Sequence, residues 1–223
     1  MPTRDLAICV RKSDFSETSQ ILTLFGREYG AVRVIAKGAF RRTKAGSSKF
    51  DGGIDLLDYG ECLYLSRPNR DLSTLTDWKL LDGHLGLRQS LPGVMLGQAI
   101  AEVLGHLLAD VDPHPALFDR MAATLPHLAG ERAEEHFLAL LIDMLEEAGY
   151  LPAFDEPQQP GGRYDPGLLR IAQTLSKLPR ENGVVQRPPK LTRGQVVSLT
   201  DFLFAHVRQI TGRPLLTRAF LPG

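Results

Sequence analysis

The chain has 223 residues, of which 43% are hydrophobic and 23% charged, so it can form one large domain or two small ones around real cores. Its net charge is zero, and its longest mostly apolar run, residues 137–145, is too short to cross a membrane. With no recognisable secretory leader and only Cys9 and Cys62, which fit buried reduced thiols, we expect a cytoplasmic protein without a membrane partner.

The first eighty residues predict five short strands. These runs are rich in β-branched and apolar residues and are separated by glycines and polar clusters; they cover residues 6–12, 19–25, 31–36, 54–66 and 72–80. In the third run Val34 faces a core, whereas Arg33 points away from it. Five short strands fit a small closed barrel, most commonly an OB-fold, although an SH3-like barrel has the same periodicity. We expect this domain to span residues 1–82.

The segment that joins the third and fourth predicted strands, residues 37–49, is strongly basic. It contains five cations and no acid, together with glycines, serines and one aromatic ring. Flexible cations beside a stacking surface suit a single strand of nucleic acid, because phosphates are neutralised while bases stack. The alternative is a solvated loop whose charges only keep the protein soluble. Since OB-folds commonly grip nucleic acid at such loops, we favour DNA contact by Lys37, Phe40, Arg41, Arg42, Lys44 and Lys49, with Arg33 as a helper.

Beyond residue 82 the hydrophobic period becomes that of helices. Thr192 and Gln195 form a capping box at the head of a last helix over residues 192–210, and Gly149 ends an earlier one. Residues 154–164, rich in proline and glycine, predict an irregular loop. The expected fold class is therefore α+β: a five-stranded OB-fold barrel followed by an all-helical domain over residues 83–223, with one irregular loop inserted.

The distribution of charge is more informative than its total, which at first argues against nucleic acid. Residues 1–50 hold ten Lys or Arg against four Asp or Glu, residues 83–160 hold three against twelve, and residues 161–223 hold ten against three. A protein can bind a polyanion with one face and repel it with another. The acidic middle should therefore face away from DNA or meet a basic partner. A second candidate group for DNA contact is Arg187, Lys190 and Arg193, with partner or structural contacts as the alternative.

No constellation supports catalysis. The chain has no phosphate-binding glycine loop, nucleophile elbow or zinc-protease motif. Glu102 and His106 share a helix face, but two ligands do not make a metal site. Glu134, Glu135, His136, Glu146 and Glu147 are mostly better interpreted as the polar face of an amphipathic helix. We expect neither an enzyme nor a metal protein.

Several strings, in order along the chain, resemble the RecO family. They are SETS (16–19), TLFGREYG (23–30), VIAKGAFRRTK (34–44), FLALLIDMLEEAGYLPAFD (137–155) and ITGRPLLTRAFL (210–221). In that family the second string reads TLFTxExG. The resemblance covers essentially the full length of the chain.

The resemblance implies an N-terminal OB-fold and a helical C-terminal domain. It further implies binding to single- and double-stranded DNA and annealing of complementary strands. With the partner RecR, family members help to place RecA on DNA covered by single-strand-binding protein, whose C-terminal tail they dock. Many members also carry a four-cysteine zinc site, but here Pro157 and Pro160 stand where its first two thiolates should be. We therefore expect a degenerate zinc-finger region and no cofactor.

Two other functions remain open. In the first, the protein is chiefly an adaptor whose last helix binds an acidic tail in an apolar pocket rimmed by arginine, formed by Phe202, Phe204 and Arg208, with core packing as the alternative role of the two rings. In the second, the barrel binds RNA with the same electrostatics.

Overall fold

The computed structural model describes residues 2–41, 50, 52–66, 71–108, 112–152 and 166–221. The chain forms two compact units. Unit 1 comprises Met1–Leu85 and Leu108–Phe118, and unit 2 comprises Gly86–Leu107 and Asp119–Gly223. Residues 108–118, which the sequence placed in the helical domain, thus group with the barrel. Among the described residues, no helix combines the length and the apolar character needed to cross a membrane.

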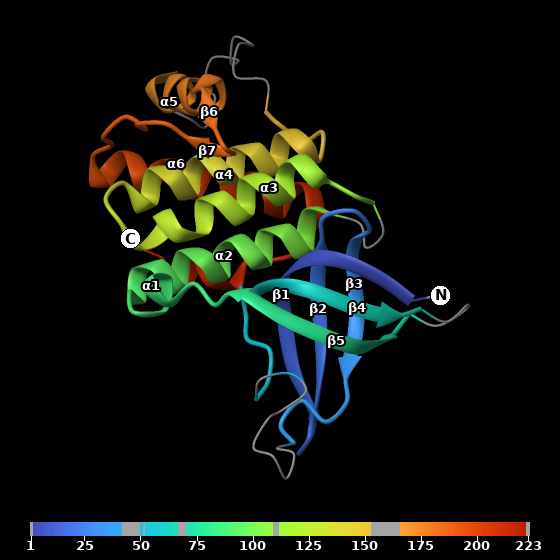
Figure 1. The fold of residues 1–223 in the computed structure, drawn as a ribbon. Helices are drawn as coiled ribbons and strands as arrows, with labels where there is room; N and C mark the ends of the chain where they lie inside the picture. The colour runs from blue at the N-terminus through green and yellow to red at the C-terminus, as the bar shows by residue number, and fades with distance from the viewer. Residues whose placement is uncertain are drawn as a thin grey trace. The chain divides into compact units, whose positions relative to one another are not determined.

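Unit 1 is built on a closed five-stranded barrel (Figure 1). Its strands are β1 (Pro2–Ser16), β2 (Ser19–Gly26), β3 (Gly30–Ala36), β4 (Tyr59–Leu65) and β5 (Ser73–Asp82). They follow the order β1-β2-β3-β5-β4, and β4 pairs back onto β1 to close the barrel. The β3–β5 pairing is parallel and the other pairings are antiparallel. This is the OB-fold topology, so the expected fold class is confirmed.

The fourth strand begins later than expected, at Tyr59 instead of residue 54. Ile54 is buried, but its backbone pairs with the side chain of Gln20: the Ile54 N–H donates to Oε1 (3.0 Å), and Nε2 donates to the Ile54 carbonyl (3.3 Å). Leu57 then adopts a φ of 66°, which interrupts an extended run. Residues 52–58 therefore form a strap that the buried amide of Gln20 holds against the barrel.

The barrel core contains both cysteines, Cys9 and Cys62, as free thiols. Burial is the main cause that raises the pKa of each to about 12, so both stay protonated and unreactive at neutral pH. The expectation of buried reduced thiols is confirmed.

A buried carboxylate holds the β2–β3 turn. The Asp5 side chain on β1 accepts hydrogen bonds from the backbone N–H groups of Glu28 and Tyr29, each at 3.1 Å. Burial raises the pKa of Asp5, while these hydrogen bonds oppose the shift. A Cβ atom on Gly26 would lie 2.3 Å from the Asp5 Oδ2 atom, so residue 26 must be glycine while Asp5 occupies this place.

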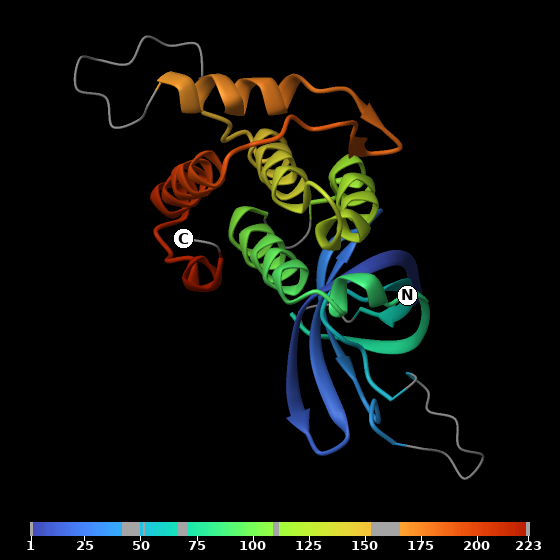
Figure 2. The same ribbon diagram turned by 90° about the vertical axis from the view of Figure 1, so that its left-hand side faces the viewer.

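Unit 2 is arranged around helix α4 (Ala133–Glu147), which is buried from Glu135 to Leu145. Helices α2 (Leu91–Leu107), α5 (Pro166–Lys177) and α6 (Arg193–Thr211) pack around it (Figure 2). The remaining helical elements of the described chain are α1 (Leu85–Arg88), α3 (Pro115–Thr124), η1 (Leu125–Ala129) and η2 (Leu216–Phe220). The capping box at the head of α6 is present as expected: Gln195 N–H donates to the Thr192 hydroxyl, and the Gln195 side chain accepts from the Thr192 N–H.

Two residues that we expected on the polar face of α4 are buried, so that interpretation was wrong for them. Glu135 is 5% exposed, and its carboxylate accepts the Leu191 N–H at 2.9 Å. His136 is 8% exposed, and its ring centroid lies 4.9 Å from that of the exposed His127. Polar residues of this helix are therefore used inside the unit, each against a specific neighbour.

The helical domain also contains a small hairpin that the sequence analysis missed, formed by β6 (Arg180–Glu181) and β7 (Val184–Val185). Its turn is Asn182-Gly183, with φ values of 50° and 85°. Positive φ at both central residues defines a type I′ turn, for which Asn-Gly is the strongest sequence signal.

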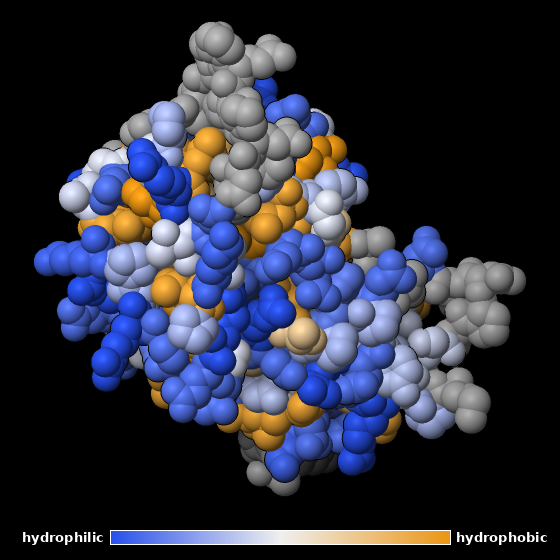
Figure 3. Space-filling model, turned by 90° about the horizontal axis from the view of Figure 1, so that it is seen from above, coloured by the Kyte–Doolittle hydropathy of each residue, from blue (hydrophilic) through white to orange (hydrophobic). Residues whose placement is uncertain are grey.

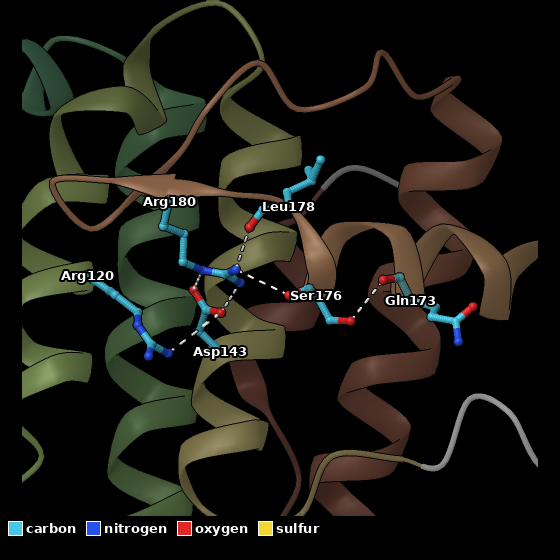
Figure 4. A network of polar contacts seen from close by, with 6 residues as sticks. All are labelled: Arg120, Asp143, Gln173, Ser176, Leu178 and Arg180. Carbon is cyan, nitrogen blue, oxygen red and sulfur yellow. Dashed lines mark hydrogen bonds and ion pairs between the residues drawn. The ribbon is translucent and has the colours of Figure 1, made fainter.

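The hairpin is fixed to α4 by a cluster of ions around the buried Asp143 carboxylate (Figure 4). The Asp143 side chain on α4 is almost fully buried and binds the Arg180 guanidinium through both oxygens, with Nε to Oδ2 at 3.0 Å. Nη1 of Arg120 lies 3.8 Å from Oδ1 of Asp143. Nη1 of Arg180 also donates hydrogen bonds to the carbonyls of Ser176 (3.2 Å) and Leu178 (2.8 Å). Burial raises the pKa of Asp143, and the two arginines oppose that shift. One arginine thus joins the hairpin, the end of α5 and α4.

We expect Arg180→Met to lower the free energy of unfolding by about 3 kcal/mol, because it leaves the buried Asp143 carboxylate with the more distant Arg120 alone. The double variant Asp143→Leu/Arg180→Met should lose less, since no buried charge is left over. Chemical denaturation checks both values. Arg170→Met, which removes an exposed arginine of α5, is the control. Equal losses in the single and double variants would contradict the assigned role of the charge.

The burial of His136 predicts a pH dependence of stability. Desolvation, followed by repulsion from His127, lowers the pKa of His136 below 6.5 in the folded state. The folded state thus resists protonation, so this stability is present above pH 6.5 and is lost as the pH falls through that value towards the folded pKa. The melting temperature should therefore drop less between pH 7.5 and 5.5 in His136→Gln than in the wild type. An unchanged drop in this variant would refute the assignment, and His127→Gln should show a smaller effect.

Candidate nucleic-acid interface

The turn after β3 presents three of the predicted DNA-binding residues. Lys37, Phe40 and Arg41 are exposed, whereas Ala39 between them is fully buried in the barrel core. The Arg41 N–H closes the turn on the Gly38 carbonyl at 3.0 Å. Because Ala39 anchors this turn, the side chains on either side of it are directed to solvent.

The same turn lies against the β1–β2 turn at one end of the barrel (Figure 1). The Phe40 N–H reaches the Thr18 carbonyl at 3.5 Å. The Phe40 ring is 39% exposed and rests on the strap, since a Cβ atom on Gly53 would lie 2.8 Å from its Cε1 atom. Because Gly53 has no side chain, the Phe40 ring can pack directly on the backbone of the strap. The exposed part of the ring can contact a ligand.

Arg33 belongs to a row of side chains on the outer face of the barrel. Thr23 on β2 pairs with Arg33 on β3 and with Arg11 on β1, so the three side chains point to the same side. Arg11 and Arg33 are both exposed. Arg11 was missed by sequence reasoning because simple alternation from the buried Cys9 would put it inside. A register shift between Cys9 and Arg11 turns it outward.

Among the described residues, these cations differ from Lys12 and Arg27 in having no acidic partner. Lys12 pairs with Asp55, and Arg27 pairs with Glu28. In the described ranges of the chain, Arg11, Arg33, Lys37 and Arg41 have no carboxylate within 4.0 Å. Four exposed cations that are not neutralised locally are available to phosphates. The other predicted members of this surface, Arg42, Lys44 and Lys49, lie outside the described residues and stay predictions.

The second basic group lies in unit 2. Arg187 and Lys190 are exposed around the buried Pro188, and Arg193 is the exposed first residue of α6. The Leu191 N–H bond to Glu135 fixes this segment to α4. The structure therefore brings the three residues onto one short exposed stretch.

The predicted partner residues divide between the core and a groove. Phe202 and Phe204 are each 5% exposed, and the Phe204 ring packs towards that of Phe137 with centroids 6.5 Å apart. A groove of about 1290 Å³ between α5 and α6 is lined by Leu168, Ile171, Phe202, Ala205 and Arg208, among others, but not by Phe204. The structure thus brings Phe202 and Arg208 together and leaves Phe204 in the core.

Apolar surface is divided into separate patches among polar and charged side chains on the face shown in Figure 3.

Glu102, one of the residues considered for metal binding, has another role. Glu102 accepts hydrogen bonds from the N–H groups of Leu216 (2.7 Å) and Thr217 (2.9 Å) at the start of η2, which explains its place on α2 without a metal. The described ranges contain no group of three or more His, Cys, Asp or Glu side chains that could hold a metal ion. The stretch that carries the family's zinc ligands, with Pro157 and Pro160 here, lies outside the described residues.

Comparison with known proteins decides the family. The model "Recombination protein O N terminal" matches residues 1–84, which include the barrel, and "Recombination protein O C terminal" matches residues 88–183. The DNA repair protein RecO of Cupriavidus metallidurans is 31% identical over 239 residues, covering 98% of this chain and 76% of the relative. The chain belongs to the RecO family.

Two further RecO relatives match shorter regions. The DNA repair protein RecO of Salinibacter ruber is 33% identical over 171 residues, covering 76% of this chain and 64% of the relative. That of Rhodopirellula baltica is 37% identical over 149 residues, covering 66% of this chain and 54% of the relative. The chain therefore spans less than two thirds of the length of these two RecO proteins.

Proposed function

We propose that this chain is a non-enzymatic DNA-binding protein of recombinational repair, which binds single- and double-stranded DNA and anneals complementary strands. The observation that carries the proposal is the barrel surface formed by Arg11, Arg33, Lys37 and Arg41, whose cations have no acidic partner among the described residues. The relatives named as DNA repair proteins support the biological setting.

Such a surface favours contact with phosphates over the reading of sequence. Lysine and arginine side chains neutralise phosphates of any sequence, and release of counterions makes the affinity depend on salt. Annealing requires this property, because both strands must be held without preference while their bases find each other. The protein's part is to lower the repulsion between two polyanions.

The resemblance to RecO proteins extends the proposal to partners. We propose that the protein acts together with RecR. The outcome of this action is the loading of RecA on DNA covered by single-strand-binding protein. No metal is needed for this role: the two cysteines of the chain, Cys9 and Cys62, are buried in the barrel, so we propose that the protein functions without structural zinc.

A second candidate function is that of an adaptor for the C-terminal tail of single-strand-binding protein. The groove between α5 and α6 favours it, because apolar Leu168, Ile171 and Phe202 lie in the same groove as the exposed Arg208. An aromatic residue at the end of an acidic tail could occupy the apolar part, while Arg208 binds its carboxylates.

For the DNA-binding proposal, we expect Arg33→Ala/Arg41→Ala to weaken binding to all sequences about equally. Loss of two phosphate contacts should also reduce the slope of log K against log salt by about 1.4 for a single strand. Fluorescence anisotropy at several salt concentrations measures both effects. Annealing of two complementary fluorescent oligonucleotides, which the wild type should accelerate, should slow in the variant.

Lys12→Ala/Lys79→Ala is the matched control, since it removes two lysines that already have acidic neighbours, Asp55 by an ion pair and Glu61 by cross-strand pairing. An unchanged salt slope in Arg33→Ala/Arg41→Ala would remove this surface from the proposal. RNA oligonucleotides of the same sequence provide the third comparison: tighter binding of RNA than of DNA would favour an RNA-binding barrel.

For the adaptor proposal, Arg208→Glu should weaken binding of a fluorescent acidic peptide with a terminal aromatic residue by about tenfold or more, because a charge-assisted contact is replaced by repulsion. Arg213→Glu changes the charge equally on an exposed residue outside the groove lining and should have little effect. Equal affinities of the two variants would exclude this groove as the docking site.

A further inference from the structure

The β1–β2 hairpin carries an exposed aromatic residue at its tip. Asp14 pairs with Gln20 and Ser16 with Ser19, and the register shifts between these two pairs. Phe15 therefore lies at a β-bulge, a feature that re-aims a side chain. It is 61% exposed, and no ring contact of Phe15 exists in the part of the chain that the structure describes. A large apolar ring placed this way contributes little to the barrel core.

The surroundings of Phe15 favour nucleic acid as its partner. The hairpin tip is hydrogen-bonded to the turn that carries Lys37, Phe40 and Arg41, through the Phe40 N–H and the Thr18 carbonyl. Two exposed rings thus lie on neighbouring turns at one end of the barrel, together with two cations that have no acidic partner among the described residues. Aromatic platforms beside cationic side chains are the components of a site for single strands.

Carboxylates beside Phe15 determine which part of the nucleic acid can meet the ring. Asp14 and Glu17 are both exposed and flank it in the chain. They repel phosphates, so a strand must approach Phe15 with its bases while its phosphates lie towards Lys37 and Arg41. A duplex cannot do so, because its base faces are covered by stacking within the helix and its outer surface is lined with phosphates.

We propose that Phe15 stacks on an unpaired base and makes this end of the barrel selective for single-stranded over double-stranded DNA. The proposal rests on the proposed function and adds to it a residue that determines the preferred form of the ligand. It assigns the cations to affinity for any DNA and the hairpin tip to the distinction between the two forms.

Tyr29 provides a matched control in the same barrel. Its ring is 53% exposed, and it lies in the β2–β3 turn, at the other end of β2 from the hairpin tip. In that turn Arg27 is already paired with Glu28. An effect of exposed aromatic residues in general would appear at both positions, whereas a stacking site would appear only at Phe15.

The first experiment compares Phe15→Ala with Tyr29→Ala for binding to a single strand and to a duplex of equal length. Phe15→Ala should weaken single-strand binding by at least about fivefold, the lower end of the loss for one base–aromatic stack. Its duplex affinity and its salt slope should stay as in the wild type, because no phosphate contact is lost. Tyr29→Ala should bind both ligands as the wild type does. Equal weakening of both ligands by Phe15→Ala, or no weakening, overturns the proposal.

Phe15→Trp tests stacking directly and keeps an aromatic ring at the tip. The native chain has one tryptophan, Trp78, which is 4% exposed in the barrel core and gives a constant background. A single strand should quench the additional emission of this variant, and a duplex should leave it unchanged. Quenching by the duplex to the same extent overturns the selectivity.

The failure of this inference is distinguishable from failure of the proposed function. If Arg33→Ala/Arg41→Ala weakens DNA binding while Phe15→Ala does not, the proposed function stands and the role of Phe15 is wrong. If the wild type binds neither DNA form, both are wrong.

Discussion

Closure of the barrel depends on β1, which pairs with two neighbouring strands. β1 pairs with β4 through residues 2–8 and with β2 through residues 7–16, so that closure requires β1 to bend where the two pairings overlap. The register shift between Cys9 and Arg11 provides this bend, because one extra residue locally increases the twist of a strand. The shift lets Cys9 and Val10 both be buried and turns Arg11 outward. Closure of the core and the placement of a cation beside Thr23 and Arg33 thus have the same cause. Past the bend, β1 and β2 continue to the tip that carries Phe15.

Unit 2 shows a different use of charge. The acidic middle of the sequence was expected to face away from DNA or to meet a basic partner, but several of its carboxylates bind later parts of the same chain. Asp143 binds Arg180, Glu135 accepts the Leu191 N–H, and Glu102 accepts the N–H groups of Leu216 and Thr217. These contacts join α4 to the hairpin, α4 to the start of α6, and α2 to η2. Part of the negative charge therefore holds the C-terminal third of the chain to the helices before it.

Residue patterns predicted the elements that are determined by residues close together in the sequence. Alternation in β3 placed Val34 inside and Arg33 outside, and the capping box at Thr192 located the start of α6 to the residue. Features that depend on distant partners were not predictable in this way. The strap before β4 is held by Gln20, 34 residues earlier than Ile54, and Glu135 is buried because Leu191 approaches it. The signals for the β6–β7 turn (Asn182-Gly183) and for Phe15, a lone aromatic among polar residues beside a turn, were present. Both are short local features within segments whose strongest patterns are a basic run and a helical periodicity.

The contact between Asp5 and Gly26 has a consequence for how this chain can vary. A Cβ atom at position 26 would lie 2.3 Å from Oδ2 of Asp5 and 2.9 Å from the carbonyl oxygen of Gly30. A smaller residue at position 5 would therefore not by itself make room for a larger one at position 26, because the backbone of the turn would still obstruct it. The buried carboxylate, the glycine and the path of the turn thus constrain one another, so that a change at position 26 requires changes at both of the others.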